Sequence, residues 1–425
     1  MVKLRRLTIH KYRNVVPETT LEFGDGINVL LGKNGAGKTT LLKVISAVLR
    51  SDFRSIEGEY QFSYVIEFPE GRAEVSVRPA SIVDPVRDPS RPSLQHEVEH
   101  LSDVEIYLWL KETNQPLRFY RKDSLYVLDG EKGEKPMVPA DRIIANHVYF
   151  VVAMSRQYLE RGPTLFLDLG SPFRIDESLD MFRRVLDESF GSPQNPDEPE
   201  EPVFLVFRNT DGRIHAMGAN GLTAPLWEPL NARLDRDNDL RQVLFPHTDL
   251  EFLGNVVRLG GFRAAELRLE LIQTSVQDGT EYSHLGKPRI WFTGRDGSVI
   301  SQQLLSYGQK RLLAFFYYLA AQPSTVVADE LVNGLHYDWI EECVKAIGQR
   351  QAFLTSQNPL LLDCLPFETI EQVKGSFVMC ESKLENDREH LEWRNFSDDE
   401  ADEFLKAYKV GFQDVGQILR TKGLW

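Results

Sequence analysis

A glycine-rich segment near the start of the chain constrains the fold more than any other stretch. Residues 32–40 read Gly-Lys-Asn-Gly-Ala-Gly-Lys-Thr-Thr, which satisfies the pattern G-x-x-x-x-G-K-[ST] in full. The segment follows an apolar run at 27–31 and precedes a helical pattern at 41–48. Strand, loop and helix in that order are the context that the pattern needs. The sequence therefore predicts a phosphate-binding loop and not a simple glycine turn.

Each residue of this loop has an expected role in binding a nucleotide. Backbone amides and the positive end of the following helix are expected to surround phosphate oxygens. Lys38 is expected to reach the β- and γ-phosphates, and Thr39 to place its hydroxyl on Mg²⁺. The residues predicted to bind the nucleotide here are Asn34, Gly35, Ala36, Gly37, Lys38, Thr39 and Thr40.

Composition limits what can surround such a site. The 425 residues are 42% hydrophobic and 26% charged, as in ordinary soluble proteins. No apolar run approaches the length of a membrane span, and the first residues lack the pattern of a signal peptide, so we expect a cytoplasmic protein without a membrane partner. Three widely spaced cysteines favour neither a disulfide framework nor a zinc cluster. The net charge of −14 argues against non-specific coating of nucleic acid, although a local basic surface remains compatible with it.

A pair of carboxylates far along the chain forms a second candidate for chemistry. Residues 325–330 read Thr-Val-Val-Ala-Asp-Glu, a β-branched strand that ends in Asp329 and Glu330. Asp329 is expected to hold Mg²⁺ through water, and Glu330 to accept a proton from the attacking water. Two acids facing solvent after a core strand would be the better interpretation if the phosphate loop were absent. If strands from both ends of the chain form one sheet, Lys38 and Asp329 should lie close together near its edge.

Two further segments place polar residues next to apolar ones. Ser306 and Gly308 open an apolar helix that is predicted to run to Ala321, and a hydroxyl with a glycine amide at a helix start can bind an anion. Taken alone, Ser306 is more often a simple N-cap. The apolar strand at 147–154 leads into Arg156 and Gln157, which either line the nucleotide site, with Gln157 as a candidate metal ligand, or simply end the strand.

The remaining segments are predicted to form structural elements without site residues. Pro-, Glu- and Asp-rich residues 191–202 indicate a surface loop, and Ser397 is expected to cap an acidic helix start at 396–403. The sequence lacks heptads sustained over several turns, so we expect no long coiled-coil arm. The other predicted elements are strands at 60–77, 104–110 and 117–128, hairpins at 203–217 and 289–300, strands at 265–274 and 352–355, and helices at 178–190 and 339–349.

The order of these motifs resembles a known family. Phosphate loop, Leu-Ser-Tyr-Gly-Gln, Val-Val-Ala-Asp-Glu, Asn-Gly-Leu-His and Leu-Thr-Ser-Gln-Asn-Pro are similar to the ABC-type ATPase heads of the RecF, structural-maintenance-of-chromosomes (SMC) and OLD group. The opening Leu-Thr-Ile-His-Lys-Tyr-Arg-Asn at 7–14 resembles the N-terminal strand of that group. The matches lie in residues 1–50 and 300–365.

The resemblance implies ATP and Mg²⁺ as cofactors and a homodimer as the working form. It makes Arg13 a candidate nucleotide contact, Glu330 the general base and Asp329 a metal partner. Ser306, Gly308 and Gln309 would form the signature that reaches the γ-phosphate of the opposite subunit. ATP would then be held between two heads, so that binding closes them and hydrolysis reopens them.

Two positions depart from the family pattern. Gln357 stands where the group usually has a switch histidine, and an amide donates a hydrogen bond but cannot become cationic. We therefore expect slow hydrolysis whose pH profile lacks a histidine-like inflection from this site, and we expect Gln357→Ala to be less active than the parent. Tyr307 replaces the first signature glycine, so the anion site should survive with a ring beside it.

As fold class we predict an α/β, ABC-type P-loop NTPase head assembled from both ends of the chain. Its N-terminal half would span residues 1–83 with the phosphate loop, and its C-terminal half 285–425 with the signature, the carboxylates and the switch. A mixed α+β insertion at 84–284 would extend one lobe.

The predicted function is that of an ATP-hydrolysing switch. OLD proteins carry a nuclease domain after the ATPase, but the residues beyond 359 show no acidic constellation of that kind, so we expect an ATPase without effector chemistry of its own. The chain resembles the stand-alone ATP-binding proteins of the group, and this resemblance implies a separate effector, a nuclease or a toxin, in antiviral defence. The alternative is a RecF-like DNA-repair ATPase that grips DNA when ATP binds. A transporter subunit is disfavoured by the middle insertion and by the N-terminal strand.

Overall fold

The computed structural model spans the whole chain, and two compact units are described within it. The first, called the N/C unit, comprises Met1–Phe173, Ser324–Asn333 and Ile347–Trp425. The second, called the middle unit, comprises Arg174–Pro323 and Gly334–Ala346. The structure describes residues 2–50, 53, 56–69, 71–79, 102–111, 116–122, 125–129, 135–139, 204–208, 214–218, 224–234, 242–277, 280–286, 289–321, 325–356, 359–385, 388–411 and 413–421.

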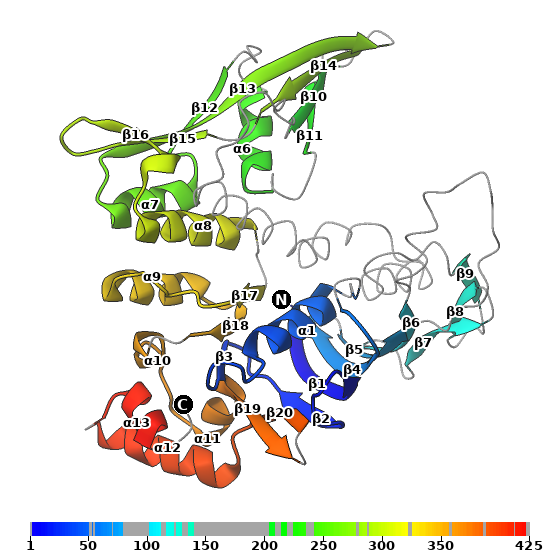
Figure 1. Cartoon of the computed structure of the whole chain (residues 1–425). Helices are drawn as coiled ribbons and strands as arrows, with labels where there is room; N and C mark the ends of the chain where they lie inside the picture. Colours follow the sequence, from blue (N-terminus) through cyan, green and yellow to red (C-terminus); the bar gives the residue numbers. More distant parts are fainter. Residues whose placement is uncertain are drawn as a thin grey trace. The chain divides into compact units, whose positions relative to one another are not determined.

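A five-stranded sheet forms the core of the N/C unit. Its strand order is β17-β18-β3-β19-β20, and the first four strands are parallel whereas β20 is antiparallel to β19. Only β3 comes from the start of the chain, so the predicted assembly of one α/β head from both ends is confirmed (Figure 1). The strands are β3 (Ile27–Leu31), β17 (Thr325–Ala328), β18 (Gln351–Thr355), β19 (Phe377–Glu385) and β20 (Arg388–Asn395).

Helix α1 (Lys38–Arg50) follows the phosphate loop and is buried around most of its circumference. Leu41, Val44, Ile45 and Val48 have no exposed surface, and the helix contacts β17 and β18. Thr39 and Lys43 are exposed, so a narrow polar face remains beside the apolar faces that pack on the sheet. The start of α1 is thereby fixed against the carboxyl ends of the parallel strands, where ligands bind in open α/β sheets.

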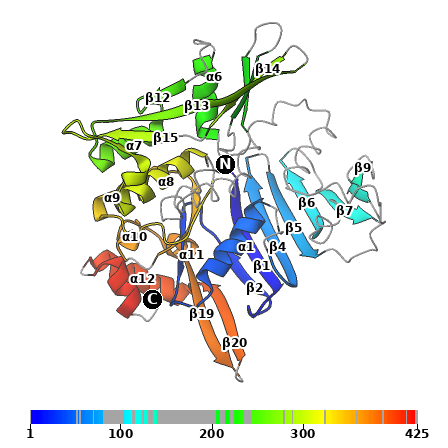
Figure 2. The same cartoon turned by 45° about the horizontal axis from the view of Figure 1, so that its top comes forward.

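An eight-stranded antiparallel sheet forms the second layer of the N/C unit. Its order is β2-β1-β4-β5-β6-β7-β8-β9, and Figure 2 shows β1, β4 and β5 side by side. Leu4, Leu7 and Ile9 on β1 are fully buried, whereas Arg6 and Lys11 are exposed, so one face of the sheet packs on the core. The strands are β1 (Lys3–Tyr12), β2 (Thr19–Glu22), β4 (Tyr60–Phe68), β5 (Gly71–Pro79), β6 (Ser102–Leu110), β7 (Leu117–Lys122), β8 (Leu125–Asp129) and β9 (Lys135–Pro139).

Buried amides join the two sheets at the end of β18 away from the nucleotide loop. The Gln351 side chain is fully buried, accepts a hydrogen bond from the Leu4 amide at 2.8 Å and donates to the Leu4 carbonyl at 2.8 Å. Its amide also donates to the Gly24 carbonyl at 2.7 Å. Because an unpaired buried amide is costly, these bonds fix the register between β1 and β18.

Four short helices complete the described part of the N/C unit: α10 (Leu360–Asp363), α11 (Ile370–Ser376), α12 (Asp398–Val410) and α13 (Val415–Thr421). Ser397 caps α12, since its hydroxyl accepts from the Glu400 amide while the Glu400 carboxylate accepts from the Ser397 amide. The predicted cap is confirmed. Arg394 forms a two-pronged ion pair with Glu400, which ties α12 to β20.

The middle unit is built on a twisted antiparallel sheet with helices. Its strand order is β11-β10-β14-β13-β15-β16, with β12 also pairing with β13. Helices α7 and α8 pack against each other, and α7 contacts β13 (Figure 1). The elements are β10 (Phe204–Arg208), β11 (Ile214–Gly218), α6 (Ala224–Leu234), β12 (Gln242–Pro246), α7 (Glu251–Gly260), β13 (Ala264–Gln277), β14 (Thr280–Leu285), β15 (Arg289–Thr293), β16 (Val299–Ser301), η5 (Gln302–Leu304), α8 (Tyr307–Ala321) and α9 (Tyr337–Ile347).

Most predicted scaffold elements that fall on described residues are confirmed. The hairpins at 203–217 and 289–300 are the pairs β10–β11 and β15–β16. The helix predicted at 339–349 is α9, which begins two positions earlier and ends at Ile347. The strand at 147–154, the helix at 178–190 and the loop at 191–202 lie outside the described residues. None of the helices within the described ranges is long and apolar enough to span a lipid bilayer.

Candidate nucleotide-binding site

The phosphate loop lies between β3 and α1, where the sequence placed it. Gly35 and Gly37 have φ angles of 87° and 81°, a region that residues with a side chain rarely adopt. Space for a Cβ is available at Gly35, whereas a Cβ on Gly37 would lie 2.8 Å from the Leu391 side chain. Conformation alone requires the first of these glycines, and both conformation and close packing require the second.

Lys38 is the buried cation of this loop. Its side chain is 9% exposed, and its ammonium group donates to the Gly32 carbonyl at 2.7 Å and to the Lys33 carbonyl at 3.0 Å. The lysine is therefore held along the inside of the loop, where a phosphate would gain a fixed positive charge. Burial raises the pKa of the neighbouring Cys380 thiol to about 12, and the Lys38 charge opposes that rise. Cys380 accordingly stays a neutral thiol at physiological pH.

The structure joins the phosphate loop to the distant carboxylate pair. Thr39 donates from its hydroxyl to one oxygen of Asp329 at 2.8 Å, although 290 positions separate them in sequence. Asp329 directly follows β17, and Thr39 lies in the first turn of α1. Lys38 and Asp329 were expected to lie close together near one edge of the sheet, and the bond to Asp329 from Thr39, the residue after Lys38, agrees with that expectation.

Glu330 follows in an unusual backbone conformation. Its φ angle is 50°, a left-handed value that costs free energy for a residue other than glycine. The Asn333 side-chain amide donates to the Glu330 carboxylate, and the Asn333 backbone amide donates to the Glu330 carbonyl at 3.2 Å. A tight turn after β17 thus fixes the carboxylate beside Asp329, and such strain is concentrated at functional sites.

Thr355, at the end of β18, holds both acids and was not singled out as a site residue from the sequence. Its hydroxyl donates to the second oxygen of Asp329 and accepts from the Glu330 backbone amide at 2.8 Å. The pairing of β17 with β18 brings it there. The available signal was its position, because the carboxyl ends of neighbouring parallel strands meet at one edge.

The donor set fits Mg²⁺ bound together with a nucleotide. A threonine hydroxyl and a carboxylate are oxygen ligands, which this cation prefers, and phosphates and water usually supply its remaining ligands. The part of the chain that the structure describes contains no cluster of three or more histidine, cysteine or acidic side chains that could hold a metal by itself. Such a sparse protein contribution is typical of a metal that arrives with its substrate.

The signature segment in the middle unit begins helix α8 with a reciprocal cap. The Ser306 amide donates to the Gln309 side-chain oxygen at 2.9 Å, and the Gln309 amide donates to the Ser306 hydroxyl at 3.3 Å. Ser306 is exposed. Ser306 is an N-cap, and its exposed position at a helix start is compatible with anion binding.

Tyr307 occupies the position of the first signature glycine. An added Cβ on Gly334 would lie 2.5 Å from the Tyr307 ring, so glycine at 334 makes room for the ring. Arg311, one turn later, donates to the Tyr307 hydroxyl at 3.0 Å. An added Cβ on Gly308 would likewise lie 2.9 Å from the Gly334 carbonyl oxygen. The signature therefore packs tightly on the turn before α9.

Arg13 lies at the end of β1 with a φ angle of 46°. Its guanidinium lies 5.3 Å from the centre of the Tyr12 ring and 3.3 Å from the Glu57 carboxylate, and its side chain is 46% exposed. An arginine that is partly exposed and only loosely paired can change partners at little cost. Arg13 thus stays a candidate nucleotide contact. Gln357, Gln157 and Arg156 lie outside the described residues, so their assigned roles stay predictions.

Comparison with known proteins agrees with these features. Residues 6–81 match a family model described as an AAA domain, and residues 164–363 match one described as "AAA domain, putative AbiEii toxin, Type IV TA system". The DNA double-strand break repair Rad50 ATPase of Methanopyrus kandleri is 42% identical over 77 residues, 18% of this chain and 7% of that protein. RecF of Teredinibacter turnerae is 48% identical over 48 residues, 11% of this chain and 12% of RecF. The matches thus span under an eighth of the length of these relatives.

Among solved structures, an SMC head domain from Thermotoga maritima aligns with 13% identity and a TM-score of 0.37, covering 92% of this chain and 98% of that one. A RecF structure titled "Structure of the recombination mediator protein RecF-ATPrS in RecFOR pathway" gives 12% identity and a TM-score of 0.29, covering 93% and 98%.

The fold and the phosphate loop define a P-loop ATPase head with an α/β core. With the local RecF and Rad50 matches around the loop and the two AAA-domain matches, the chain is similar to ABC-type ATPases of the RecF and Rad50 kind.

Proposed function

We propose that this protein binds ATP with Mg²⁺ at the phosphate loop and hydrolyses it slowly. The observation that carries the proposal is the hydrogen bond between Thr39 and Asp329, because it joins the first turn after the phosphate loop to the carboxylate pair. Lys38 supplies the positive charge for the β- and γ-phosphates, and the glycine-rich backbone supplies amide donors. Bound Mg²⁺ would neutralise phosphate charge, with Thr39 and Asp329 as its protein partners.

Glu330 acts as the general base in this proposal. A water oxygen attacks the γ-phosphorus, one water proton passes to the Glu330 carboxylate, and ADP leaves with the electrons of the broken P–O bond. Asn333 and Thr355 keep Glu330 in place through its carboxylate and its backbone amide respectively. Their role is to hold the base in the reactive orientation while phosphate is transferred to water.

We propose that this ATPase cycle works as a switch that changes how the protein holds a partner. Ser306, Gly308 and Gln309 at the exposed start of α8 are proposed to complete the site of a second copy, so that two heads close on ATP and reopen after hydrolysis. Control of a separate effector, a nuclease or a toxin in antiviral defence, is supported by the match of residues 164–363 to a model whose description includes a putative toxin.

A RecF-like DNA clamp is the second candidate. The observation that favours it is the local identity to RecF and Rad50, proteins named for DNA repair. In that case the closed dimer would grip DNA directly, and its affinity for DNA would fall steeply with salt because phosphate contacts release counterions.

The test is a pull-down of the Glu330→Gln protein from its own host in ATP and Mg²⁺, with bound proteins and nucleic acid both identified. The amide cannot accept the water proton, so the closed state should persist. A stoichiometric second protein, lost when Lys38→Ala is added, would support the effector switch. Recovery of DNA alone with the same dependence on Lys38 would favour the clamp. Failure of the parent to hydrolyse ATP would contradict both.

A further inference from the structure

The hairpin β19–β20 lies against the phosphate loop at three of its residues. An added Cβ on Gly32 would lie 2.1 Å from the Cys380 carbonyl oxygen on β19, and one on Gly37 would lie 2.8 Å from Leu391 and 3.1 Å from the Trp393 ring on β20. Between these positions, the Ala36 carbonyl accepts a hydrogen bond from the Trp393 indole N–H at 3.1 Å. The loop thus rests on a protein surface that comes from the far end of the chain.

The indole bond is buried and therefore specific. Trp393 and Ala36 are each 2% exposed, so water does not compete for either group. A buried indole N–H needs an acceptor, and a buried carbonyl needs a donor. Each satisfies the other, and loss of one leaves the partner unpaired in an apolar setting.

Peptide geometry converts this bond into an orientation of the next amide. The Ala36 carbonyl and the Gly37 N–H belong to one planar trans peptide, in which the two groups point in opposite directions. Because the carbonyl points to Trp393 on β20, the Gly37 N–H points away from β20. Amides at this place in a phosphate loop are the donors that surround phosphate oxygens.

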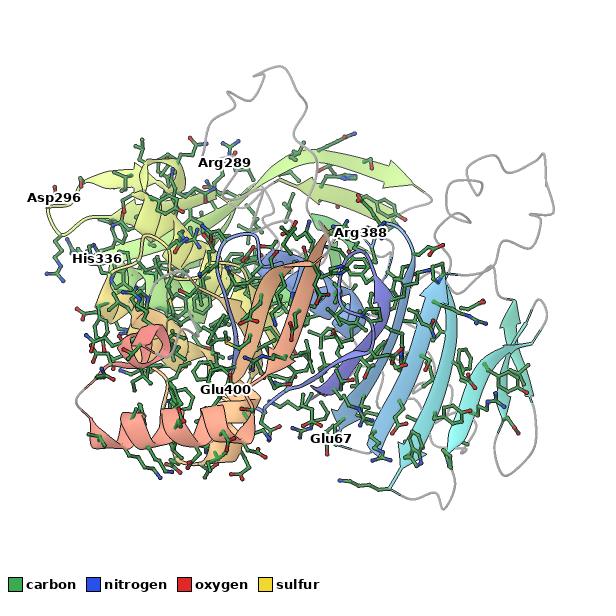
Figure 3. All side chains as sticks on the ribbon, turned by 60° about the horizontal axis from the view of Figure 1, so that its bottom comes forward. Glu67, Arg289, Asp296, His336, Arg388 and Glu400 are labelled. Atoms are coloured by element: carbon green, nitrogen blue, oxygen red, sulfur yellow. The ribbon has the colours of Figure 1, made fainter. Side chains whose placement is uncertain are left out.

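The surface that carries Trp393 is fixed independently of the loop. The Leu391 amide donates to the Asn14 carbonyl at 2.9 Å, and the Val16 amide donates to the Leu391 carbonyl at 2.9 Å. Arg394, the next residue after Trp393, is held by its ion pair with Glu400. Figure 3 labels Glu400 beside one end of the hairpin and Arg388 at the other, where β20 begins. Trp393 therefore acts from a strand that is anchored on both sides of it.

We propose that Trp393 is a positioning residue for nucleotide binding, which orients the Gly37 amide toward the phosphates by holding the Ala36 carbonyl. The proposal rests on the proposed binding of ATP at this loop. It makes the C-terminal hairpin a part of the nucleotide site, although no residue of that hairpin belongs to the phosphate-loop pattern.

The test compares Trp393→Phe with the parent in two measurements. The first is hydrogen–deuterium exchange of the loop amides without nucleotide, which should be several-fold faster in the variant because the loop loses its buried bond. The second is the dissociation constant for ATP with Mg²⁺ by calorimetry, which should rise about fivefold to tenfold, in line with the loss of one buried hydrogen bond.

Phe396→Leu is the matched control. Phe396 is buried in the same C-terminal layer and packs on Phe377 and Phe404. Its variant should melt at a lower temperature while keeping the loop exchange and the ATP affinity of the parent. A Trp393→Phe protein whose loop exchange and ATP affinity match the parent would overturn the proposal, as would equal changes in the control, which would indicate general loosening.

Loop exchange also separates this proposal from the proposed function. If the parent did not bind ATP, the proposed function would fail and the role in nucleotide binding with it, while faster exchange in Trp393→Phe would still show that the indole holds the loop. Should Trp393→Phe not fold, replacement of Trp393 by 3-benzothienylalanine keeps the shape of the indole and removes only its N–H, and loop exchange that stays at the parent rate in that variant would overturn the proposal.

Discussion

Two helix starts in this protein carry the residue types of an anion site, and they are built differently. Helix α1 begins directly after a glycine loop whose lysine bonds the loop carbonyls and whose threonine bonds a distant carboxylate. Helix α8 begins with a cap that is closed on itself, because Ser306 and Gln309 satisfy each other's backbone amides. The first start is bonded to a carboxylate 290 positions away in sequence, whereas the cap of the second joins residues three positions apart. In the proposed function, α1 holds the nucleotide within one copy and α8 completes the site of a second copy.

The largest effect is expected at Glu330, which follows the Asp329 carboxylate that is bonded to Thr39 of α1. Glu330→Gln should lower the rate of ATP hydrolysis about 100-fold to 10,000-fold, since general base catalysis contributes on this scale. The dissociation constant for ATP should change little, because the neutral amide keeps the shape of the side chain. Steady-state phosphate release and equilibrium binding measure the two quantities. Hydrolysis at the parent rate would remove Glu330 from the mechanism.

Thr355→Val should reduce hydrolysis about tenfold to a hundredfold. Its hydroxyl bonds the Asp329 carboxylate and the Glu330 amide, and hydrogen bonds to charged groups contribute about 1.5–3 kcal/mol. The same substitution at Thr325, buried at the opposite end of β17, is the matched control and should leave hydrolysis within about twofold of the parent. Equal losses in both variants would point to a general effect on the sheet.

Ser306→Asp sharpens the contrast between the two helix starts. Aspartate caps helices as well as serine does, so the free energy of unfolding should stay close to that of the parent. An added negative charge at the helix start should oppose a phosphate and lower hydrolysis about tenfold, most visibly at protein concentrations that favour dimers. Parent-like hydrolysis in Ser306→Asp would make Ser306 a cap and nothing more.

Ser397→Ala is expected to change stability without changing chemistry. Ser397 caps α12 with the same reciprocal bonds as Ser306, and losing such a cap costs about 1 kcal/mol. Urea unfolding should show that loss, and the rate of ATP hydrolysis at 25 °C should equal that of the parent. A drop in hydrolysis would mean that α12 supports the site more directly than its contacts indicate.

The smallest effect is expected from Glu400→Gln, through pH. The ion pair with Arg394 lowers the pKa of Glu400 below its ordinary value. A carboxyl whose pKa is lower in the folded state stabilises the fold above its unfolded pKa, and this contribution is lost as the pH falls through the folded pKa. Glu400→Gln should therefore unfold more easily at neutral pH, and its stability should fall less between pH 5 and pH 3, as measured by urea unfolding at each pH. An identical acid profile in both proteins would contradict the assignment.

The accuracy of sequence reasoning differed between local and non-local features. The phosphate loop, the Ser397 cap and the β10–β11 hairpin depend on neighbouring residues, and the structure contains all three. Thr355 and Trp393 were not identified as site residues, since neither belongs to a motif. The hydrogen bond from Trp393 to Ala36 joins positions 357 residues apart. No period or spacing in the chain encodes that pairing.

Sequence alone determined that this protein contains a P-loop ATPase head, because a glycine pattern that needs positive φ angles, a buried lysine and a strand ending in two acids is recognisable from residue types. Tertiary structure decided which groups share the site. Parallel strands β17, β18 and β3 come from both ends of the chain, and their pairing brings Thr39, Asp329 and Thr355 within hydrogen-bonding distance. The physical reason is that a hydrogen bond depends on distances of a few ångströms, which only the packed sheet sets.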